Sequence, residues 1–146
     1  MSDIRIVKAT KDTKLSWDDL RSLLEQLTSS NVVFGEKEYG QLVSSESSTL
    51  FLMYSGETLI GMSTIATYLC PTGRKSWIED VVIDQNYRGK GLGRRMLDYL
   101  LAYVHKQEDT TLMLTSRPSR VAANQLYQSL DFEKRNTNVY RIKCKK

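Results

Sequence analysis

Several residue types are scarce in this chain, and each scarcity excludes a class of protein. The 146 residues include two cysteines, two prolines and one histidine. Cys70 and Cys144 leave a single structural disulfide open, but we expect free thiols in a reducing cytoplasm, and their spacing suits no zinc site, so we expect no metal. The single histidine, His105, is expected near the C-terminal end of a helix, where the helix dipole favours it.

Long apolar runs are also missing. No stretch reaches the roughly 20 apolar residues that a membrane-spanning helix needs. The first residues, Met1-Ser2-Asp3-Ile4-Arg5, lack the basic and then apolar layout of a secretory signal. We therefore expect a cytoplasmic protein with no membrane segment.

Neither sign of charge dominates the sequence. It carries 21 Lys and Arg against 17 Asp and Glu, a formal net charge of +4. Acidic residues are interspersed throughout, and the basic cluster at the end is Lys143-Cys144-Lys145-Lys146. Because proteins that bind nucleic acid usually gather basic residues on one face or arm, we do not expect nucleic acid as a partner.

Apolar periodicity predicts the order of helices and strands. Helical spacing and capping residues predict helices from the Ser16 N-cap to Leu27, over Glu36–Val43, from Leu92 to about His105, and from a Ser119 cap to Leu130. Alternation or buried apolar runs predict strands from Ile4 and over Leu50–Tyr54, Leu59–Leu69, Ser76–Ile83, Leu112–Leu114, Phe132–Arg135 and Val139–Ile142, the last two forming a hairpin.

This order predicts an α/β protein with a mixed, mainly antiparallel sheet. An antiparallel meander comes first, and a strand–helix–strand crossover then makes its two strands parallel. Hydrophobic residues make up 40% of the chain and charged residues 26%, as in ordinary globular proteins. We expect a single domain over residues 1–146.

The most informative stretch is Tyr87-Arg88-Gly89-Lys90-Gly91-Leu92-Gly93, between a predicted buried strand and a predicted long helix. Glycines let the backbone reach positive φ and approach a ligand closely. Free N–H groups at a helix start attract anions, and Arg88, Lys90, Arg94 and Arg95 add positive charge. The pattern therefore predicts a cradle for a pyrophosphate.

Two common glycine motifs do not fit this turn. The dinucleotide-binding pattern G-x-G-x-x-G would need a glycine at Arg94. The Walker pattern needs Ser or Thr after Gly-Lys, where this chain has Gly91. The form present, over Arg88–Gly93, is Arg, two residues, then two glycines separated by one residue.

That form resembles the acyl-coenzyme A signature of the GNAT superfamily of N-acetyltransferases. Trp77–Asp84 resembles the family's fourth strand, and Ala123-Asn124-Gln125-Leu126-Tyr127 with Leu130-Asp131-Phe132 resembles a later family segment. The chain departs from the family at Arg120, where Asn is frequent, and at Asp131, where Gly is usual. Asp131 is expected in a turn with an unusual backbone conformation.

The resemblance implies a GNAT-like sheet of about seven strands flanked by about four helices, with the cofactor at splayed central strands. It implies acetyl-coenzyme A as cosubstrate. Because no cysteine has the surroundings that would activate it for an acetyl-cysteine route, we expect direct attack by a primary amine in a ternary complex. The cofactor-binding residues expected from it are Val81, Val82, Ile83, Arg88, Gly89, Lys90, Gly91, Leu92, Gly93, Arg94, Asn124 and Tyr127.

Glu79 is the candidate catalytic base, because an acceptor ammonium must lose a proton before it can attack. Strand alternation predicts Glu79 on one face with Trp77, Val81 and Ile83, while Ile78, Asp80 and Val82 share the other. Partial desolvation beside Trp77 would raise the Glu79 pKa. The alternatives stay open: Asp80 is the base, or Glu79 is only an exposed carboxylate at the strand end or a structural ion-pair partner of Lys75 or Arg74.

Tyr127 is the candidate acid for the leaving thiolate. Arg120, Asn124 and Tyr127 are spaced to share one helix face, and the resemblance favours a role at the cofactor. The alternative is a ring that only packs and forms local hydrogen bonds.

The function expected is transfer of an acetyl group to an amine, on a small molecule rather than a protein. A coenzyme A-binding regulatory module without turnover is the alternative. The sequence leaves the acceptor and the number of subunits open, a homodimer included.

Overall fold

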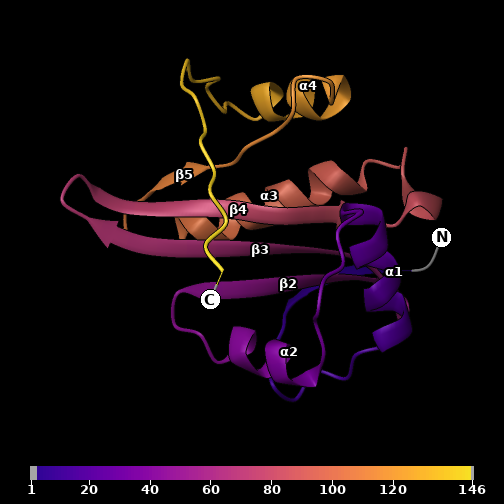
Figure 1. Cartoon of the computed structure of the whole chain (residues 1–146). Helices are drawn as coiled ribbons and strands as arrows, with labels where there is room; N and C mark the ends of the chain where they lie inside the picture. The colour runs from indigo at the N-terminus through magenta and orange to yellow at the C-terminus, as the bar shows by residue number, and fades with distance from the viewer. Residues whose placement is uncertain (1–2, 146) are drawn as a thin grey trace. The chain divides into compact units, whose positions relative to one another are not determined.

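A five-stranded sheet organises most of the computed structural model, which describes residues 3–145 (Figure 1). The strands are β1 (Ile4–Lys8), β2 (Ser48–Ser55), β3 (Thr58–Cys70), β4 (Gly73–Ile83) and β5 (Thr111–Met113). The helices are α1 (Trp17–Leu27), α2 (Glu36–Val43), α3 (Leu92–His105) and α4 (Val121–Ser129). The chain divides into two compact units, Met1–Leu114 and Thr115–Lys146. A single domain stays a prediction.

The sheet has the predicted topology. Its strands follow the order β1-β2-β3-β4-β5, and neighbours are antiparallel up to β4. The crossover through α3 then makes β5 parallel to β4. The mixed, mainly antiparallel α/β class is therefore confirmed.

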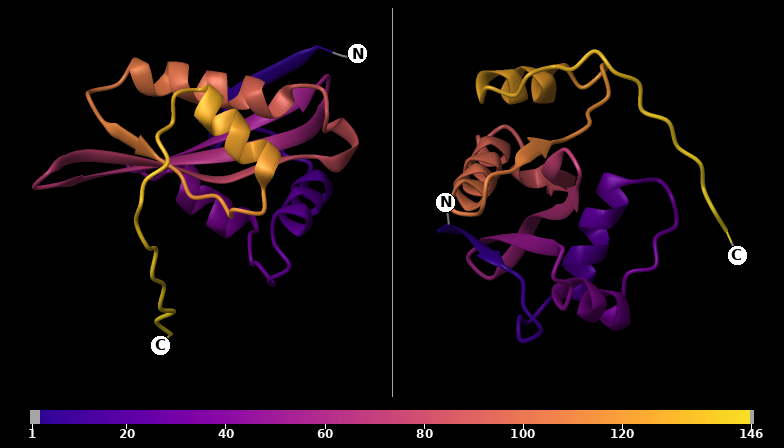
Figure 2. Two further views of the ribbon diagram at one scale, coloured as in Figure 1. Left: turned by 90° about the horizontal axis from the view of Figure 1, so that it is seen from above. Right: turned by 90° about the vertical axis from the view of Figure 1, so that its left-hand side faces the viewer.

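The two faces of the sheet carry separate sets of apolar side chains, because successive residues of a strand point to opposite faces. Figure 2 shows α3 on one face and α1 with α2 on the other. Leu52, Met62 and Val82 belong to the buried cluster that includes Leu20 and Leu23 of α1 and Tyr39 of α2. On the opposite face, the Phe51 ring makes edge contacts with Tyr99 and Tyr103 of α3, at centroid distances of 5.6 and 4.9 Å.

One predicted helix cap is confirmed and one is wrong. The Ser16 hydroxyl accepts a hydrogen bond from the Asp19 N–H at 3.3 Å and caps α1. Ser119 does not cap α4, whose N-cap residue is Arg120. The reason is a turn just before the helix, in which the Arg120 N–H donates to the Arg117 carbonyl at 3.0 Å and moves the helix start one residue later.

The predicted C-terminal hairpin is not formed. Residues 132–145 have no regular secondary structure, and Val139, Tyr140 and Ile142 are exposed. Alternating apolar residues make a strand only where a neighbouring strand accepts the backbone hydrogen bonds, and Thr115–Lys146 contains no strand among its described residues. The expectation for Asp131 is confirmed, because its φ of 70° is left-handed. Within residues 3–145, no helix is both long and apolar enough to span a bilayer.

Candidate active site

The glycine turn leads from β4 into α3 and adopts the backbone conformation that its glycines allow. Gly89 has φ of 77° and Gly91, the N-cap of α3, has φ of 75°. Residues other than glycine rarely adopt this left-handed backbone conformation. A Cβ added at Gly89, Gly91 or Gly93 would meet no atom within 4 Å, so all three glycines border open space.

The start of α3 presents backbone donors to that space. The first helical hydrogen bond runs from the Arg95 N–H to the Gly91 carbonyl at 3.1 Å. The N–H groups of Leu92, Gly93 and Arg94 therefore have no partner within the helix. With the dipole of a 14-residue helix behind them, these groups form a site for an anion.

The basic side chains of the turn are held in different ways. Arg88 Nε donates to the Ile83 carbonyl at 3.1 Å, which ties the turn to the end of β4. The Lys90 ammonium lies over the Tyr87 ring, 5.2 Å from its centroid. Arg94 Nε lies 3.9 Å from an Asp98 carboxylate oxygen, in an exposed pair.

Arg95 makes a contact outside the turn, because its Nη2 donates a hydrogen bond to the Ile4 carbonyl at 2.9 Å. Because this contact is with β1, Arg95 holds α3 to the first strand. Arg88, Lys90 and Arg94 are then the basic residues of the turn that remain as candidates for phosphate contact.

Among the described residues, no strand lies beside the edge of β4 that follows its pairing with β5. The register joins Lys75, Ser76 and Trp77 to Thr111, Leu112 and Met113, and β5 ends there. The rest of β4, Ile78–Ile83, thus extends past β5. This edge includes Val81, Val82 and Ile83, where the resemblance implied that the cofactor binds.

A β-bulge interrupts β4 at Asp80, and it changes which residues share a face. Met62 pairs with Val82, whereas Thr64 pairs with Glu79, so two residues of β4 lie opposite Ser63 alone. Asp80 has a left-handed φ of 53°. Glu79 therefore lies on the same face as Val82, towards α1 and α2.

The predicted alternation was wrong beyond Glu79 for this reason. An extra residue in one strand reverses the faces of everything that follows it. Trp77 and Glu79 do share a face, because their partners Ala66 and Thr64 are two residues apart in β3.

The Glu79 side chain is exposed and its carboxyl has a raised pKa. Partial desolvation, and next the negative charge of Asp80, raise the pKa of the Glu79 carboxyl above its ordinary value. The direction is the one expected for a general base that must take a proton near neutral pH.

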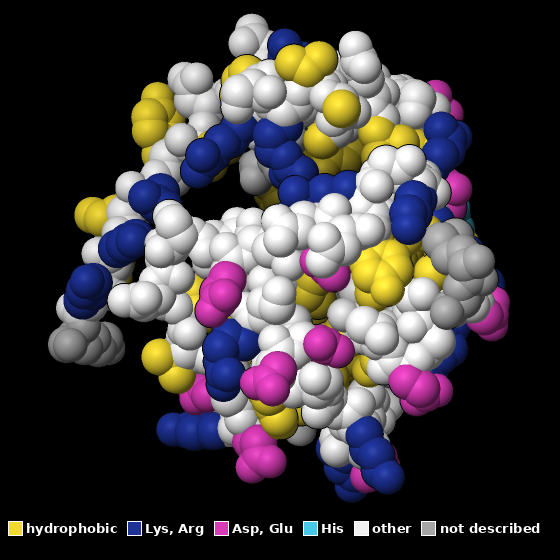
Figure 3. Space-filling view, turned by 90° about the vertical axis from the view of Figure 1, so that its right-hand side faces the viewer, with side chains coloured by type: hydrophobic (Ala, Val, Ile, Leu, Met, Phe, Trp, Pro, Cys, Tyr) yellow, Lys and Arg dark blue, Asp and Glu magenta, His cyan; other side chains and the backbone are white. Residues whose placement is uncertain are grey.

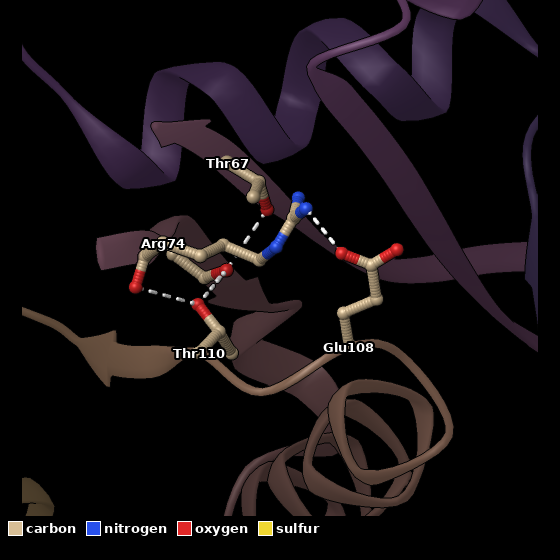
Figure 4. A network of polar contacts seen from close by, with 5 residues as sticks. Thr67, Arg74, Glu108 and Thr110 are labelled. Carbon is tan, nitrogen blue, oxygen red and sulfur yellow. Dashed lines mark hydrogen bonds and ion pairs between the residues drawn. The ribbon is translucent and has the colours of Figure 1, made fainter. Parts of the chain in front are cut away.

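The alternative that Glu79 is a structural ion-pair partner finds no support in the described part of the chain. Arg74 Nη2 lies 2.5 Å from a Glu108 carboxylate oxygen (Figure 4). Beside that pair, hydroxyls form a chain: Thr67 with Ser76 at 2.9 Å, Ser76 with Thr110 at 2.9 Å, and Thr110 to the Arg74 carbonyl at 3.3 Å. These bonds join the β3–β4 hairpin to the segment before β5, and Arg74 is committed there.

Gln26 of α1 supports the start of the glycine turn, and the sequence did not reveal this role. Its Nε2 donates to an Asp84 carboxylate oxygen at 3.0 Å, and its Oε1 accepts the Gln85 N–H at 2.8 Å. Asp19, near the other end of α1, accepts the Leu59 N–H at 3.4 Å. Because Leu59 and Asp84 lie at the same end of β3 and β4, α1 crosses these strands there and fixes the start of the glycine turn.

A hollow of about 370 Å³ lies between α1 and the connection to α2. The aromatic rings of Trp17 and Phe34 form part of its wall, and Arg21, Glu25 and Asn31 contribute polar groups. Figure 3 views the molecule from the side on which α1 lies, and most acidic side chains on this face gather in its lower part.

The second unit holds the remaining two predicted site residues. Tyr127 of α4 is buried, and its ring makes an edge contact with Phe132 at a centroid distance of 6.2 Å. Asn124 Nδ2 donates to the Arg117 carbonyl at 3.0 Å. Both side chains are less exposed than those of Gln125 and Gln128, as expected for residues on one face of α4.

A family model of the acetyltransferase (GNAT) family matches residues 15–132, which include β2–β5 and all four helices. The chain belongs to the GNAT acetyltransferase family. The sequence resemblance is thereby confirmed.

Relatives and solved structures agree with this membership. The chain is 40% identical over 53 residues to the [ribosomal protein bS18]-alanine N-acetyltransferase of Escherichia coli K12, and the match spans 36% of each protein. An aminoglycoside acetyltransferase from an uncultured soil metagenomic sample, solved with sisomicin, has the same fold with a TM-score of 0.78, 14% identity and 97% coverage of both chains. A predicted acetyltransferase from Clostridium acetobutylicum, solved with acetyl-CoA, also has this fold. Its TM-score is 0.74, its sequence identity is 16%, and the match covers 96% of both chains.

Proposed function

We propose that this GNAT family member is an N-acetyltransferase that moves an acetyl group from acetyl-CoA to a primary amine. The observation that carries the proposal is the glycine turn, which opens α3 with free N–H groups at the edge where β4 leaves β5. A pyrophosphate would bind the N–H groups of Leu92–Arg94, with Arg88 and Lys90 adding charge. The free edge of β4 would hold the thioester arm through backbone groups of Val81–Ile83.

The chemistry proposed is direct attack in a ternary complex. An alkylammonium has a pKa of about 10.4 and no lone pair, so a base must remove a proton first. Glu79 takes that proton, the amine nitrogen bonds to the thioester carbonyl carbon, and the carbon–sulfur bond breaks. Tyr127 gives a proton to the departing thiolate. Because neither cysteine is placed in this site, no acetyl-cysteine intermediate is proposed.

The acceptor is proposed to be a small molecule, and the protein to work in the cytoplasm, either alone or as a homodimer. The similar proteins include one named an aminoglycoside acetyltransferase and one named a [ribosomal protein bS18]-alanine N-acetyltransferase. Cys70 and Cys144 are free thiols, which suits a reducing compartment.

A direct test measures melting temperature and coenzyme release together. Acetyl-CoA should raise the melting temperature, because a ligand that binds only the native state stabilises it, while NAD should not. An amine panel should then produce free coenzyme A. Stabilisation without release from any amine would favour the regulatory module, and stabilisation by NAD instead of acetyl-CoA would overturn the coenzyme assignment.

Gly93 allows the cradle to be tested without straining the backbone. Its φ is outside the left-handed region and its Cβ position is empty, so Gly93→Ala should leave the melting temperature of the free protein unchanged or higher. The added methyl should obstruct a pyrophosphate, and we expect the Kd for acetyl-CoA to rise about 10-fold or more. Gly40→Ala in α2, which also has open space, is the matched control. An unchanged Kd in Gly93→Ala would move the phosphates elsewhere.

A further inference from the structure

Two aromatic residues lie on the sheet face that carries Glu79. The register pairs Thr64 with Glu79, Ala66 with Trp77 and Tyr68 with Lys75. Partners in an antiparallel pair share a face, and so do residues two apart in one strand. Trp77 and Tyr68 are thus diagonal neighbours on the Glu79 face. Along β4, Trp77 is roughly 7 Å from Glu79, by the rise of two strand residues.

A hydrogen bond fixes the two rings relative to one another. Trp77 Nε1 donates to the Tyr68 hydroxyl at 3.2 Å. Tyr68 is nevertheless 48% exposed, and Trp77 is only partly buried. The bond satisfies the indole N–H and leaves ring surface of both residues open to solvent.

These rings are not needed by the apolar core. The cluster beneath α1 and α2 includes Met62 of β3 and Val82 of β4, and among the described residues neither Trp77 nor Tyr68 belongs to it. An oriented aromatic pair that is outside the core, and beside a carboxylate, is suited to bind a ligand. We name the pair the aromatic platform.

We propose that the aromatic platform binds the acceptor, and that the acceptor is a primary amine carried on an aromatic or apolar group. This inference rests on the proposed function. The apolar part would pack against the Trp77 and Tyr68 rings, which attract both apolar surface and a neighbouring ammonium. The amine would then reach Glu79, about two strand residues away. A highly hydroxylated amine would make few apolar contacts with the two rings.

The test compares two small amines that differ in the group next to the amine. Phenethylamine carries a phenyl ring, and ethanolamine carries a hydroxyl. We expect kcat/KM for phenethylamine to exceed that for ethanolamine by about 10-fold or more, the effect of burying an aromatic side group. Trp77→Ala should lower the phenethylamine value much more than the ethanolamine value, and so remove most of this preference.

Leu69→Ala is the matched control, since Leu69 is on the same hairpin, is 71% exposed and points to the opposite face from Tyr68. It should keep the preference. Equal or better use of ethanolamine, or a Trp77→Ala variant that loses both activities alike, would overturn the inference and leave acetyl transfer intact. No transfer to any amine, with no thermal stabilisation by acetyl-CoA, would instead overturn the proposed function.

Discussion

Glu79→Gln should lower kcat/KM for acetyl transfer at pH 7 by about 100-fold, the usual contribution of a general base. The amide has nearly the shape of the carboxylate but cannot take the proton of the ammonium. The deficit should shrink as the pH approaches 10, because free amine then becomes abundant without a base. Initial rates over a range of pH measure both effects. A loss that is the same at every pH would remove Glu79 from the base role.

Asp80→Asn is the companion variant, because the charge of Asp80 contributes to the raised pKa of Glu79. A base works only when deprotonated, so the rate falls as pH drops through its pKa. Removing the neighbouring negative charge lowers the Glu79 pKa and should move this acidic limb to lower pH. Asn tolerates the left-handed φ of 53° that this position requires. If Asp80→Asn abolishes activity at all pH values, Asp80 is the better candidate for the base.

Tyr127→Phe should reduce turnover by about 100-fold or more while coenzyme affinity changes little. The substitution keeps the ring that packs against Phe132 and removes only the hydroxyl. The effect should become smaller with acyl donors whose thiols are more acidic, because those thiolates leave without a proton. Steady-state rates with two such donors, together with a binding measurement, test this expectation.

Tyr99→Phe is the control for Tyr127→Phe, since Tyr99 of α3 also packs edge-on against a phenylalanine, Phe51. It should leave turnover unchanged. A large loss of coenzyme affinity in Tyr127→Phe with normal turnover would make Tyr127 a binding residue rather than the acid.

The glycine turn and the order of elements could be predicted from sequence because each depends on local chemistry. Gly89 and Gly91 allow positive φ wherever they stand, and the apolar spacing from Leu92 onward defines one helix face. The faces of β4 could not be predicted, because no residue type marks a bulge and Asp80 fits ordinary alternation equally well. Its left-handed backbone depends on pairing with β3, which is a tertiary contact.

Gln26 escaped prediction for a similar reason. It follows Leu23 and Leu24 in the apolar part of α1, and its hydrogen-bond partners lie 58 and 59 residues away. For the C-terminal segment, the sequence predicted a structure that is not formed. Its alternation around Val139 and Ile142 is typical of a strand, but alternation specifies a face and cannot supply a neighbouring strand.

The two polar attachments of α1 have a consequence for how the hollow beside this helix could change its shape. Asp19 and Gln26 fix the helix to the ends of β3 and β4, so the helix is a rigid support independent of the connection that follows it. That connection carries exposed Val32 and Val33 and forms one side of the hollow beside α1. Substitutions or insertions there would reshape the hollow at small cost to folding, because loops on a fixed scaffold tolerate change. A library of variants selected only for folding should therefore accumulate changes between residues 29 and 34 before it alters α1 itself.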